Sequence, residues 1–505
     1  MASHKLKRSV ILSFGFGQLS EAVKNSGFNV FLLFYYNQVL GISATLSSIA
    51  LAIALLFDAV SDPIVGSFSD KLRTPYGRRH PLILIAALPL AISFYCLFNP
   101  PSGFSEAAYF AWLLIFAILV RGSLTLYHVP HLALGAELTE DYDQRSLLYS
   151  MSTFFGFLGG ALVVPVSYTL FFPTTEAFNP ALLNQEAYQP WALSAGAVMI
   201  VSILVCVLGT WREVPRLVAR SDALPENRMH LSELFAEFKA AFANRSFRAI
   251  FFGMMLSTMV LAVEGVFNPF MGFHFWGLTT EQLRWIPLAQ LVGLCLSVLL
   301  LPPITRWLDK KMTLIVSALV VIVNINIPIV LSLTGVAWFP DKGSEALLAL
   351  LIVSGLVTAA LAPIIFATLN SMFADIADEH ELDTGYRREG VIFAARSFAV
   401  KATGSLGLIF GGALLDVIAF PRGALMGTVD SEIVWLLGFI AGPATSVFTI
   451  LGVLLYARYS INRDRHAQIK GLLAERRSGS SDAAKSNQVR QPSIEAGMSD
   501  EGIKR

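Results

Sequence analysis

Two aspartates stand four residues apart behind a long apolar stretch. Asp58 and Asp62 follow the run LSSIALAIALLF, in the segment FDAVSDP. At this spacing on a helix their carboxylates project from one face. Two like charges there repel each other, and a bound cation or a neighbouring ammonium relieves the repulsion. A hard ion such as Na⁺ prefers carboxylate and hydroxyl oxygens, and a proton would also serve. We therefore predict a coupling-cation site, with Na⁺ as a possible ligand, at Asp58 and Asp62.

Other ionisable side chains also fall within apolar stretches. They are Glu21, Lys24, Arg121, Glu264, Arg396 and Lys401. A charge at the centre of a bilayer costs about 2.5–3.5 kcal/mol on insertion scales, so each one must have a reason to be there. Acidic and basic residues nearly balance, which favours mutual pairing around an aqueous cavity. For Arg396 the sequence leaves three partners open: an anionic substrate group, Glu264 or Asp62.

The composition places these residues in a polytopic membrane protein. Of the 505 residues, 55% are hydrophobic and 14% are charged, and the mean hydropathy is +0.62. An ordinary soluble domain has about 25% charged residues. Several apolar runs exceed the roughly 18 residues that a transmembrane helix needs. Lys and Arg concentrate in alternate short loops, which predicts a multi-pass cell-membrane protein with both termini cytoplasmic.

We predict an all-α integral membrane protein with twelve transmembrane helices. The spans lie near residues 10–40, 46–69, 81–99, 107–135, 147–172, 190–211, 249–277, 284–304, 312–336, 345–373, 389–417 and 432–457. The expected units are an N-terminal six-helix bundle, a cytoplasmic linker with an amphipathic helix, a C-terminal six-helix bundle and a mostly disordered cytoplasmic tail. Their boundaries are 1–211, 212–248, 249–457 and 458–505.

The loop after the second span resembles a signature of the major facilitator superfamily. Its pattern G-x-x-x-D-(R/K)-x-G-R-R, expanded here by LRTPY, is matched by Gly66, Asp70, Lys71, Gly77, Arg78 and Arg79. A weaker echo, TRWLDKK, stands at the matching place in the second half. The resemblance implies two pseudo-symmetric six-helix halves and a cytoplasmic gate whose charge contacts latch that side shut. A solvated basic loop is the alternative.

Five longer motifs narrow the resemblance to one family. They are FYYNQVLGIS, DAVSDPIVG, YGRRHP, YHVPHLALGAELTEDYDQRS and ADIADEHELDTGYRREGVIFAARSFAVKATGSLG. Through them, roughly residues 10 to 475 resemble the glycoside-pentoside-hexuronide:cation symporters, the melibiose permease-like family. The resemblance implies that Asp58 and Asp62 bind Na⁺, Li⁺ or H⁺ together with Thr125. It also implies that Lys401 lies between cation and substrate and pairs with the carboxylates when the cation is absent.

The substrate positions depart from the sugar-binding pattern of that family. Its two galactoside-binding aspartates fall on Ala22 and His128, a tryptophan on Leu132 and an arginine on Thr153. Melibiose itself is therefore not expected, and the YHVP spelling is similar to the eukaryotic lysophospholipid symporters. His128 and His131 flank Pro130, where they would contact substrate, relay protons or pack helices. The candidate substrate contacts are Glu21, Asn25, His128, His131, Thr153, Glu264 and Arg396, with Asn268 as a further polar candidate.

These residues predict a secondary active transporter. We expect symport of a small organic solute (sugar, glycoside or related) with Na⁺ or H⁺ by alternating access. The alternatives are a symporter of a lysolipid or other amphiphile, and an uncoupled facilitator. The sequence shows no nucleophile elbow, metal-ligand spacing or phosphate-binding Gly-rich loop, so neither an enzyme nor a cofactor is expected. The expected partners are the solute, a monovalent cation and membrane lipid, without nucleic acid, and the protein is expected to act as a monomer.

Overall fold

A computed structural model describes residues 5–221, 242, 244–384 and 389–489, and all its regular elements are helical. Eleven of these helices are long and apolar enough to cross a membrane. The first half comprises α1 (Arg8–Phe16), α2 (Leu19–Ser26), η1 (Gly27–Leu32), η2 (Tyr35–Val39), α3 (Ala44–Lys71), α4 (His80–Leu97), α5 (Glu106–Leu138), α6 (Tyr142–Leu170), η3 (Ala181–Leu183), η4 (Gln185–Ala187), α7 (Tyr188–Thr210), η5 (Trp211–Glu213) and α8 (Val214–Ser221). The second half comprises α10 (Arg245–Phe270), η6 (Met271–Phe275), α11 (Thr280–Leu283), α12 (Trp285–Trp307), α13 (Lys310–Thr334), α14 (Glu345–Thr384), α15 (Glu389–Val417), α16 (Ser431–Phe439), η7 (Ile440–Ala444), α17 (Thr445–Tyr456) and α18 (Arg463–Val489).

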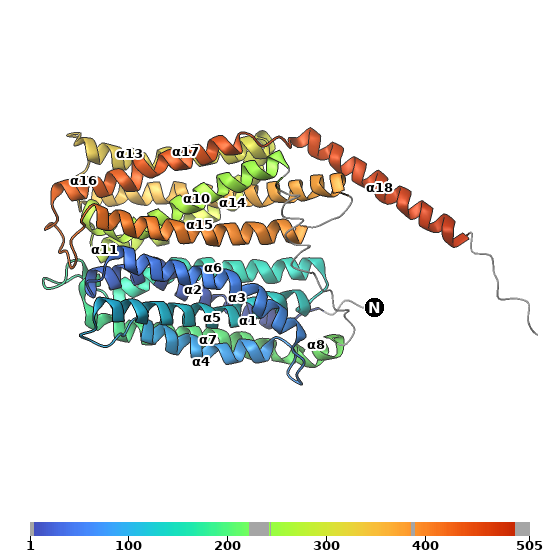
Figure 1. Cartoon of the computed structure of the whole chain (residues 1–505), viewed down its shortest axis with the longest axis horizontal. Coiled ribbons are helices and arrows are strands. Elements are labelled where there is room, and N and C mark those ends of the chain that lie inside the picture. Colours follow the sequence, from blue (N-terminus) through green and yellow to red (C-terminus); the bar gives the residue numbers. More distant parts are fainter. Residues whose placement is uncertain (1–4, 222–241, 243, 385–388, 490–505) are drawn as a thin grey trace, which may run out of the picture.

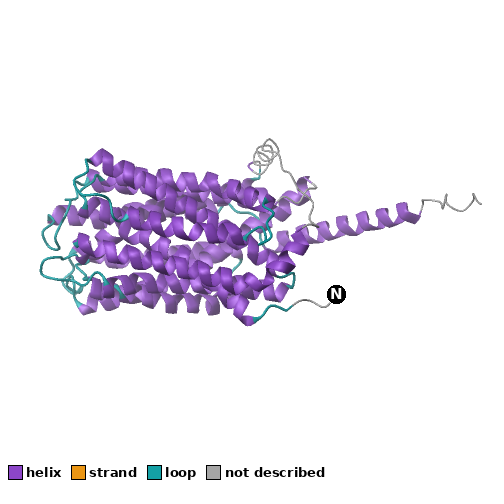
Figure 2. Cartoon of the chain, turned by 90° about the horizontal axis from the view of Figure 1, so that it is seen from below, coloured by secondary structure: helices purple, strands orange, loops and turns teal. Residues whose placement is uncertain are grey.

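The helices form two bundles that lie side by side. Helices α1 to α8 make the lower bundle of Figure 1 and α10 to α17 the upper one, which agrees with the predicted all-α fold in two halves. Loops gather at the two ends of the bundles (Figure 2). The N-terminal segment and α18 leave from the same end, which we call the terminal end; the other is the far end. The helices agree closely with the predicted spans, although α14 continues to Thr384, well beyond residue 373.

Polar side chains fix where several of these helices begin. Ser43, Ser105, Asp141 and Asn244 precede α3, α5, α6 and α10, and each side chain accepts a hydrogen bond from a backbone N–H three residues later. The first backbone N–H groups of a helix have no partner within it, so such a cap satisfies one of them. The apolar helices that carry the buried charges therefore have defined starts.

The first predicted span differs from a single helix. It is divided into α1, α2 and two π-helical segments, η1 and η2. Gly27 opens η1 beside α4, where a Cβ atom would come within 2.7 Å of the Phe94 ring, so only glycine permits this approach. Short π-helical segments occur often at functional sites because they turn side chains out of the regular helical register. Here η1 carries Phe28 and Asn29 toward the centre of the molecule.

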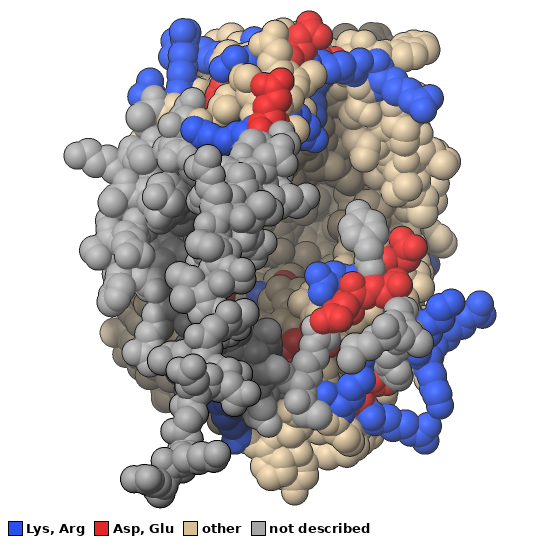
Figure 3. Space-filling view, turned by 90° about the vertical axis from the view of Figure 1, so that its right-hand side faces the viewer, with Lys and Arg blue, Asp and Glu red and all other residues tan. Residues whose placement is uncertain are grey.

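Contacts between the two halves seal the far end. Asp416 of α15 accepts hydrogen bonds from the backbone N–H groups of Ala44 at 3.2 Å and Thr45 at 2.8 Å, where α3 begins. The Phe34 ring of the first half lies 5.5 Å from Phe270 and 5.8 Å from Phe273 of the second. The terminal end differs, because its surface is hollowed between the bundles and bordered by charged side chains of both signs (Figure 3).

The structure describes the linker and the tail only in part. The predicted amphipathic helix spans residues 231–242, which lie outside the described residues except for Phe242. Within the tail, residues 463–489 form the single helix α18, and residues 490–505 lie outside the described part of the chain. Ile469 and Leu473 of this helix are buried against the second half. A polar segment has no core of its own, but a helix satisfies its backbone hydrogen bonds locally and needs only such an anchor.

Candidate functional site

The two membrane aspartates meet a hydroxyl between α3 and α5. The Thr125 Oγ1 atom lies 2.9 Å from Asp58 Oδ1 and 3.1 Å from Asp62 Oδ1. Ser61 adds a second hydroxyl, 3.5 Å from that of Thr125. A hydroxyl has one proton and donates it to one acceptor at a time, so the two facing carboxylate oxygens compete for it. We call Asp58, Asp62, Thr125 and Ser61 the carboxylate cluster, which is a compact set of oxygen ligands.

Lys401 reaches the carboxylate cluster from the other half of the molecule. Its Nζ atom, on α15, lies 3.3 Å from Asp58 Oδ2 and donates a hydrogen bond to Asp62 Oδ2. Each aspartate therefore turns one oxygen toward Thr125 and the other toward Lys401. This ion pair crosses the interface between the bundles, so a relative movement of the bundles must break or reshape it.

Arg121 is a second cation at the carboxylate cluster. Its Nη1 atom lies 3.4 Å from Asp58 Oδ2, and the residue is only 8% exposed. Its guanidinium also lies 5.1 Å from the centre of the Phe28 ring. The sequence predicts a buried charge at Arg121 but does not indicate a role for it. The sequence does contain one signal that places Arg121 at this cluster. Arg121 precedes Thr125 by four residues on the same helix, and that spacing puts both side chains on one face.

A chain of contacts leads from this cluster to the solvent-accessible centre of the molecule. The Lys24 Nζ atom lies 5.6 Å from the centre of the same Phe28 ring that Arg121 contacts. It also donates a hydrogen bond to Asn25 Oδ1 at 2.7 Å. Cations within about 6 Å of an aromatic ring are attracted to its face. Phe28 therefore joins two buried cations, one at Asp58 and one at Asn25.

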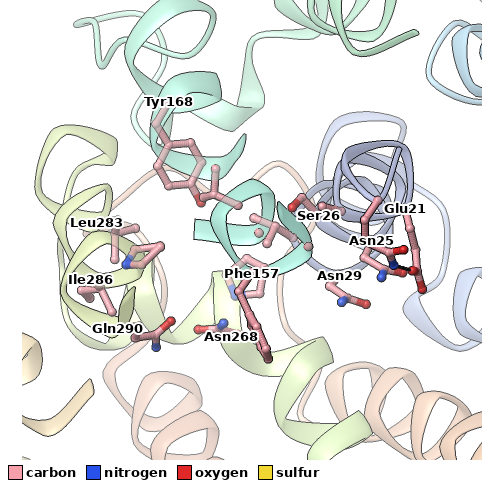
Figure 4. A pocket seen from close by; sticks show the side chains of 18 of the residues that line it. Glu21, Asn25, Ser26, Asn29, Phe157, Tyr168, Asn268, Leu283, Ile286 and Gln290 are labelled. Atoms are coloured by element: carbon pink, nitrogen blue, oxygen red, sulfur yellow. Dashed lines mark hydrogen bonds between the residues drawn. The ribbon is translucent and has the colours of Figure 1, made fainter. Parts of the chain in front are cut away.

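Asn25 lines a central cavity of about 710 Å³, which lies between helices of the two halves (Figure 4). The first half contributes α2, η1 and α6, and the second contributes α10, α11 and α12. The side chains are mostly amides, hydroxyls and apolar groups. The lining residues are Gln18, Glu21, Ala22, Asn25, Ser26, Asn29, Val30, Thr153, Gly156, Phe157, Gly160, Val164, Tyr168, Asn268, Pro269, Leu283, Ile286, Pro287 and Gln290.

The predicted substrate contacts are only partly gathered at this cavity. Glu21, Asn25 and Thr153 line it, as does Asn268. His128 lies just behind the wall, with Nδ1 3.3 Å from Glu21 Oε2. The fit of these residues to a substrate stays a prediction.

The other three predicted contacts lie outside the lining of the central cavity. His131 is fully buried, stacked on Phe14 at 4.2 Å. Arg396 lies with its guanidinium 5.7 Å from the Phe373 ring, inside the second half. Glu264 is half-buried in α10 and is not among the residues that line the central cavity. These positions favour packing for His131 and Arg396, because direct contact with a solute requires a side chain on the cavity wall.

The predicted gate loop forms contacts within the first half. Glu137 Oε1, at the end of α5, accepts hydrogen bonds from Arg78 Nε at 3.0 Å and Arg79 Nε at 2.8 Å, and Arg79 also pairs with Asp70. Gly77 has a φ of +80°, a left-handed conformation that glycine adopts without strain. Gly66 is half-buried and Lys71 is exposed.

The second half repeats this arrangement in the region of the weaker echo motif. Lys310 Nζ lies 2.7 Å from Asp375 Oδ2, on α14. In each half, a basic residue that follows the second membrane span (α3 or α12) thus pairs with a carboxylate on the fourth span (α5 or α14). The repetition agrees with two pseudo-symmetric halves.

Two helical bundles around a central cavity, with buried charges at their interface, are the architecture of a membrane transporter of the major facilitator superfamily. A family model described as MFS/sugar transport protein matches residues 13–463. The chain belongs to this family, which confirms the predicted resemblance to the glycoside-pentoside-hexuronide:cation symporters.

Named relatives and solved structures agree with this assignment. An uncharacterized symporter of Synechocystis is 24% identical, covering 94% of this chain and 98% of its own. An isoprimeverose transporter of Lactiplantibacillus pentosus is 23% identical, covering 82% and 81%. The sodium-dependent lysophosphatidylcholine symporter 1 of Gallus gallus is 22% identical, covering 90% and 87%. The crystal structure of a variant of the nucleoside transporter NupG superposes with a TM-score of 0.59 at 15% identity, covering 89% of this chain and 100% of that one, and shows the shared fold.

Proposed function

We propose that this protein is a symporter that couples a monovalent cation to the uptake of a neutral, hydroxyl-rich solute such as a glycoside. The observation that carries the proposal is the ion pair of Lys401 with Asp58 and Asp62, which joins the two halves. In transporters of this fold the halves rock around a central site. A cation bound at the carboxylate cluster takes the place of Lys401 and so changes how the halves interact.

Such a competition produces coupling by linkage. If the cation favours the arrangement that binds solute, the solute must strengthen cation binding by the same factor. Phe28 supplies a physical connection, because it contacts Arg121 at the carboxylate cluster and Lys24 beside the cavity residue Asn25. The proposed cation site and the proposed solute site thus share buried neighbours within the first half.

The lining of the central cavity supports a neutral, hydroxyl-rich solute. Five amide side chains line it: Gln18, Asn25, Asn29, Asn268 and Gln290. Amides both donate and accept hydrogen bonds, as sugar hydroxyls do. Among the described residues that line this cavity, Glu21 carries the one charge, so an anionic solute finds no cation there. The volume of about 710 Å³ lies within the roughly 300–1,000 Å³ range of small-molecule sites.

An amphiphile such as a lysolipid is the second candidate. The second half contributes apolar lining residues, Leu283 of α11 with Ile286 and Pro287 of α12. Figure 4 shows Leu283 and Ile286 across the cavity from Asn25 and Asn29. A molecule with one polar and one apolar part would match these two walls. The lysophosphatidylcholine symporter among the relatives supports this candidate, and the absence of Lys and Arg from the described lining weighs against a phosphate headgroup.

In the expected orientation, the structure corresponds to an inward-facing state. The charge of the loops predicts both termini in the cytoplasm. The far end, which Asp416 and the Phe34 contacts seal, would then face outward, and the hollowed terminal end would face the cytoplasm.

Transport into proteoliposomes tests the proposed function. Uptake of radiolabelled glycosides is measured under an inward Na⁺ gradient, an inward pH gradient or neither, with lysophosphatidylcholine as competitor. We expect gradient-driven accumulation of a glycoside in the wild type and its loss in Asp58→Asn and Asp62→Asn. Equal uptake without any gradient, or in the Asp58→Asn variant, would show an uncoupled facilitator. Inhibition by lysophosphatidylcholine alone would favour the second candidate.

A further inference from the structure

We infer that Arg121 is a fixed counter-ion of Asp58, and that it limits the exchangeable positive charge at the carboxylate cluster to one monovalent cation per transport cycle. This inference rests on the proposed symport. The Nη1 atom of the Arg121 guanidinium lies 3.4 Å from Asp58 Oδ2.

The two cations at the cluster belong to different moving parts. Arg121 lies on α5 in the same bundle as Asp58 and Asp62 of α3, whereas Lys401 lies on α15 in the other bundle. When the bundles rock, Arg121 therefore moves with the aspartates, and Lys401 moves relative to them. One positive charge is permanent at the cluster, and the other is present in only part of the cycle.

The burial of Arg121 supports a permanent role. The residue is 8% exposed and packs against Phe28, itself 7% exposed. Its Nε atom has no hydrogen-bond partner in the described part of the chain, so Asp58 supplies the ion pair that compensates this buried charge. Removing one partner of a buried ion pair leaves an uncompensated charge, which is strongly unfavourable. Lys401 is less constrained, because its side chain is 19% exposed.

The charges then determine how many ions the cluster holds. Asp58 and Asp62 carry two negative charges, and Arg121 neutralises one of them in every state. Glu21 and Lys24, nearby on α2, carry opposite charges and leave this balance unchanged. A single negative charge remains, which either Lys401 or one monovalent cation neutralises. Without Arg121 the cluster would keep a negative charge even when Lys401 is in place, and a cation would be held throughout the cycle.

The contacts of the Asp58 and Asp62 oxygens also favour the binding of a single cation. Asp58 Oδ2 already faces Arg121 and Lys401, and Asp62 Oδ2 faces Lys401. The Oδ1 atoms of the two aspartates and the hydroxyl of Thr125 remain on the opposite side. Two carboxylate oxygens and one hydroxyl are therefore the cluster oxygens that face away from Lys401.

Binding of radiolabelled Na⁺ to purified protein tests the role of Arg121 without any solute. Arg121→Gln removes the counter-charge, and Arg121→Lys retains it as the matched control. We expect Na⁺ to bind Arg121→Gln at least about tenfold more tightly than the wild type, or saturably where the wild type binds none, because a repelling charge is lost. Arg121→Lys should match the wild type. The inference would be overturned if the wild type and Arg121→Gln bound Na⁺ equally. It would also be overturned if Arg121→Lys bound Na⁺ as tightly as Arg121→Gln.

A second pair of variants keeps the test decisive if Arg121→Gln does not fold. Asp58→Asn combined with Arg121→Gln removes both partners of the ion pair, and Asp58→Asn combined with Arg121→Lys retains only the cation. The first should bind Na⁺ at least about tenfold more tightly than the second; equal affinities would overturn the inference. Failure of the symport proposal gives a different result, namely no gradient-driven glycoside accumulation in the wild type, and that result does not depend on these binding measurements.

Discussion

Asp416 caps a helix that belongs to the opposite half of the molecule. Its carboxylate accepts a hydrogen bond from the backbone N–H of Thr45 at 2.8 Å, in the first turn of α3. It also accepts hydrogen bonds from the N–H of Ala44 and the hydroxyl of Ser43. The same helix carries Asp58 and Asp62 further along. Opening of the far end must therefore remove this cap from α3, which gives the sealed state a defined stabilising contact.

Replacing Asp416 with Ala should favour opening of the far end. A helix cap contributes about 0.5–2 kcal/mol, and here it contributes only in the sealed state, so the open population should rise several-fold. The measurement is the rate at which a membrane-impermeant maleimide, added from the far side, labels a cysteine introduced at Asn268 in a protein lacking Cys96, Cys206 and Cys295.

Asp430→Ala is the matched control for this experiment. Asp430 Oδ1 accepts a hydrogen bond from the N–H of Glu432 at 2.9 Å, so it caps α16 within its own half. Its loss should not change the labelling rate. If both variants label at the same rate as the parent protein, Asp416 does not hold the far end closed.

Replacing Lys401 with Gln should abolish accumulation but not binding. The carboxylates lose the ammonium that replaces the cation, so the cation stays bound after the solute has left, and the carrier returns slowly. We expect gradient-driven accumulation to fall at least about tenfold while cation affinity rises. Glycoside uptake by proteoliposomes and radiolabelled Na⁺ binding measure the two effects. Lys401→Arg keeps the charge and should be affected less; unchanged accumulation by Lys401→Gln would exclude a coupling role.

Glu137→Gln should destabilise the first half. Glu137 is the shared acceptor of Arg78 and Arg79, and the Arg79 side chain is only 5% exposed. Leaving buried guanidinium groups without their carboxylate costs roughly 1–3 kcal/mol, which lowers the melting temperature by several degrees. Lys71→Gln is the control, because Lys71 belongs to the same predicted gate motif but is exposed. A fall of equal size in both variants would show that the Glu137 contacts contribute no specific stability.

Phe28→Leu should weaken the dependence of solute affinity on the cation. The substitution keeps an apolar side chain but removes the ring that Lys24 and Arg121 both contact, a loss of about 0.5–2 kcal/mol for each cation. Solute binding with and without Na⁺ measures the coupling factor, which should fall several-fold. Phe31→Leu in the same segment is the control, since the Phe31 ring lies 4.5 Å from the ring of Trp191. A coupling factor that is unchanged in Phe28→Leu would exclude this ring from the coupling.

The membrane spans were predictable because the lipid bilayer sets the length and the apolar character of each span. A helix in a bilayer must be apolar over about 20 residues, so runs such as the one before Asp58 show their length directly in the sequence. The first span was harder, because its division at Gly17 and its π-helical turns arise from contacts with neighbouring helices. Gly27 against Phe94 is such a contact, and hydropathy carries no trace of it.

The carboxylate cluster was partly predictable. The spacing of Asp58 and Asp62 places them on one helical face, and the family resemblance indicated Thr125 and Lys401. The position of Arg396 was not predictable, because the sequence left three partners open. The structure places its guanidinium over the Phe373 ring. Sequence defines which residues share a face of one helix, but the rotation of that helix against its neighbours depends on packing.

Helix α18 moves with one bundle only, because Ile469 and Leu473 bury themselves in the second half and Arg463 Nη2 donates to the carbonyl of Thr305 there at 3.1 Å. Twenty-seven residues of α-helix extend about 40 Å, which makes this segment a long lever fixed at one end. A small tilt of the bundle therefore becomes a large sweep of the lever's free tip. A fluorophore attached near Val489 would report the rocking of the transporter through its distance from a partner dye on the first half.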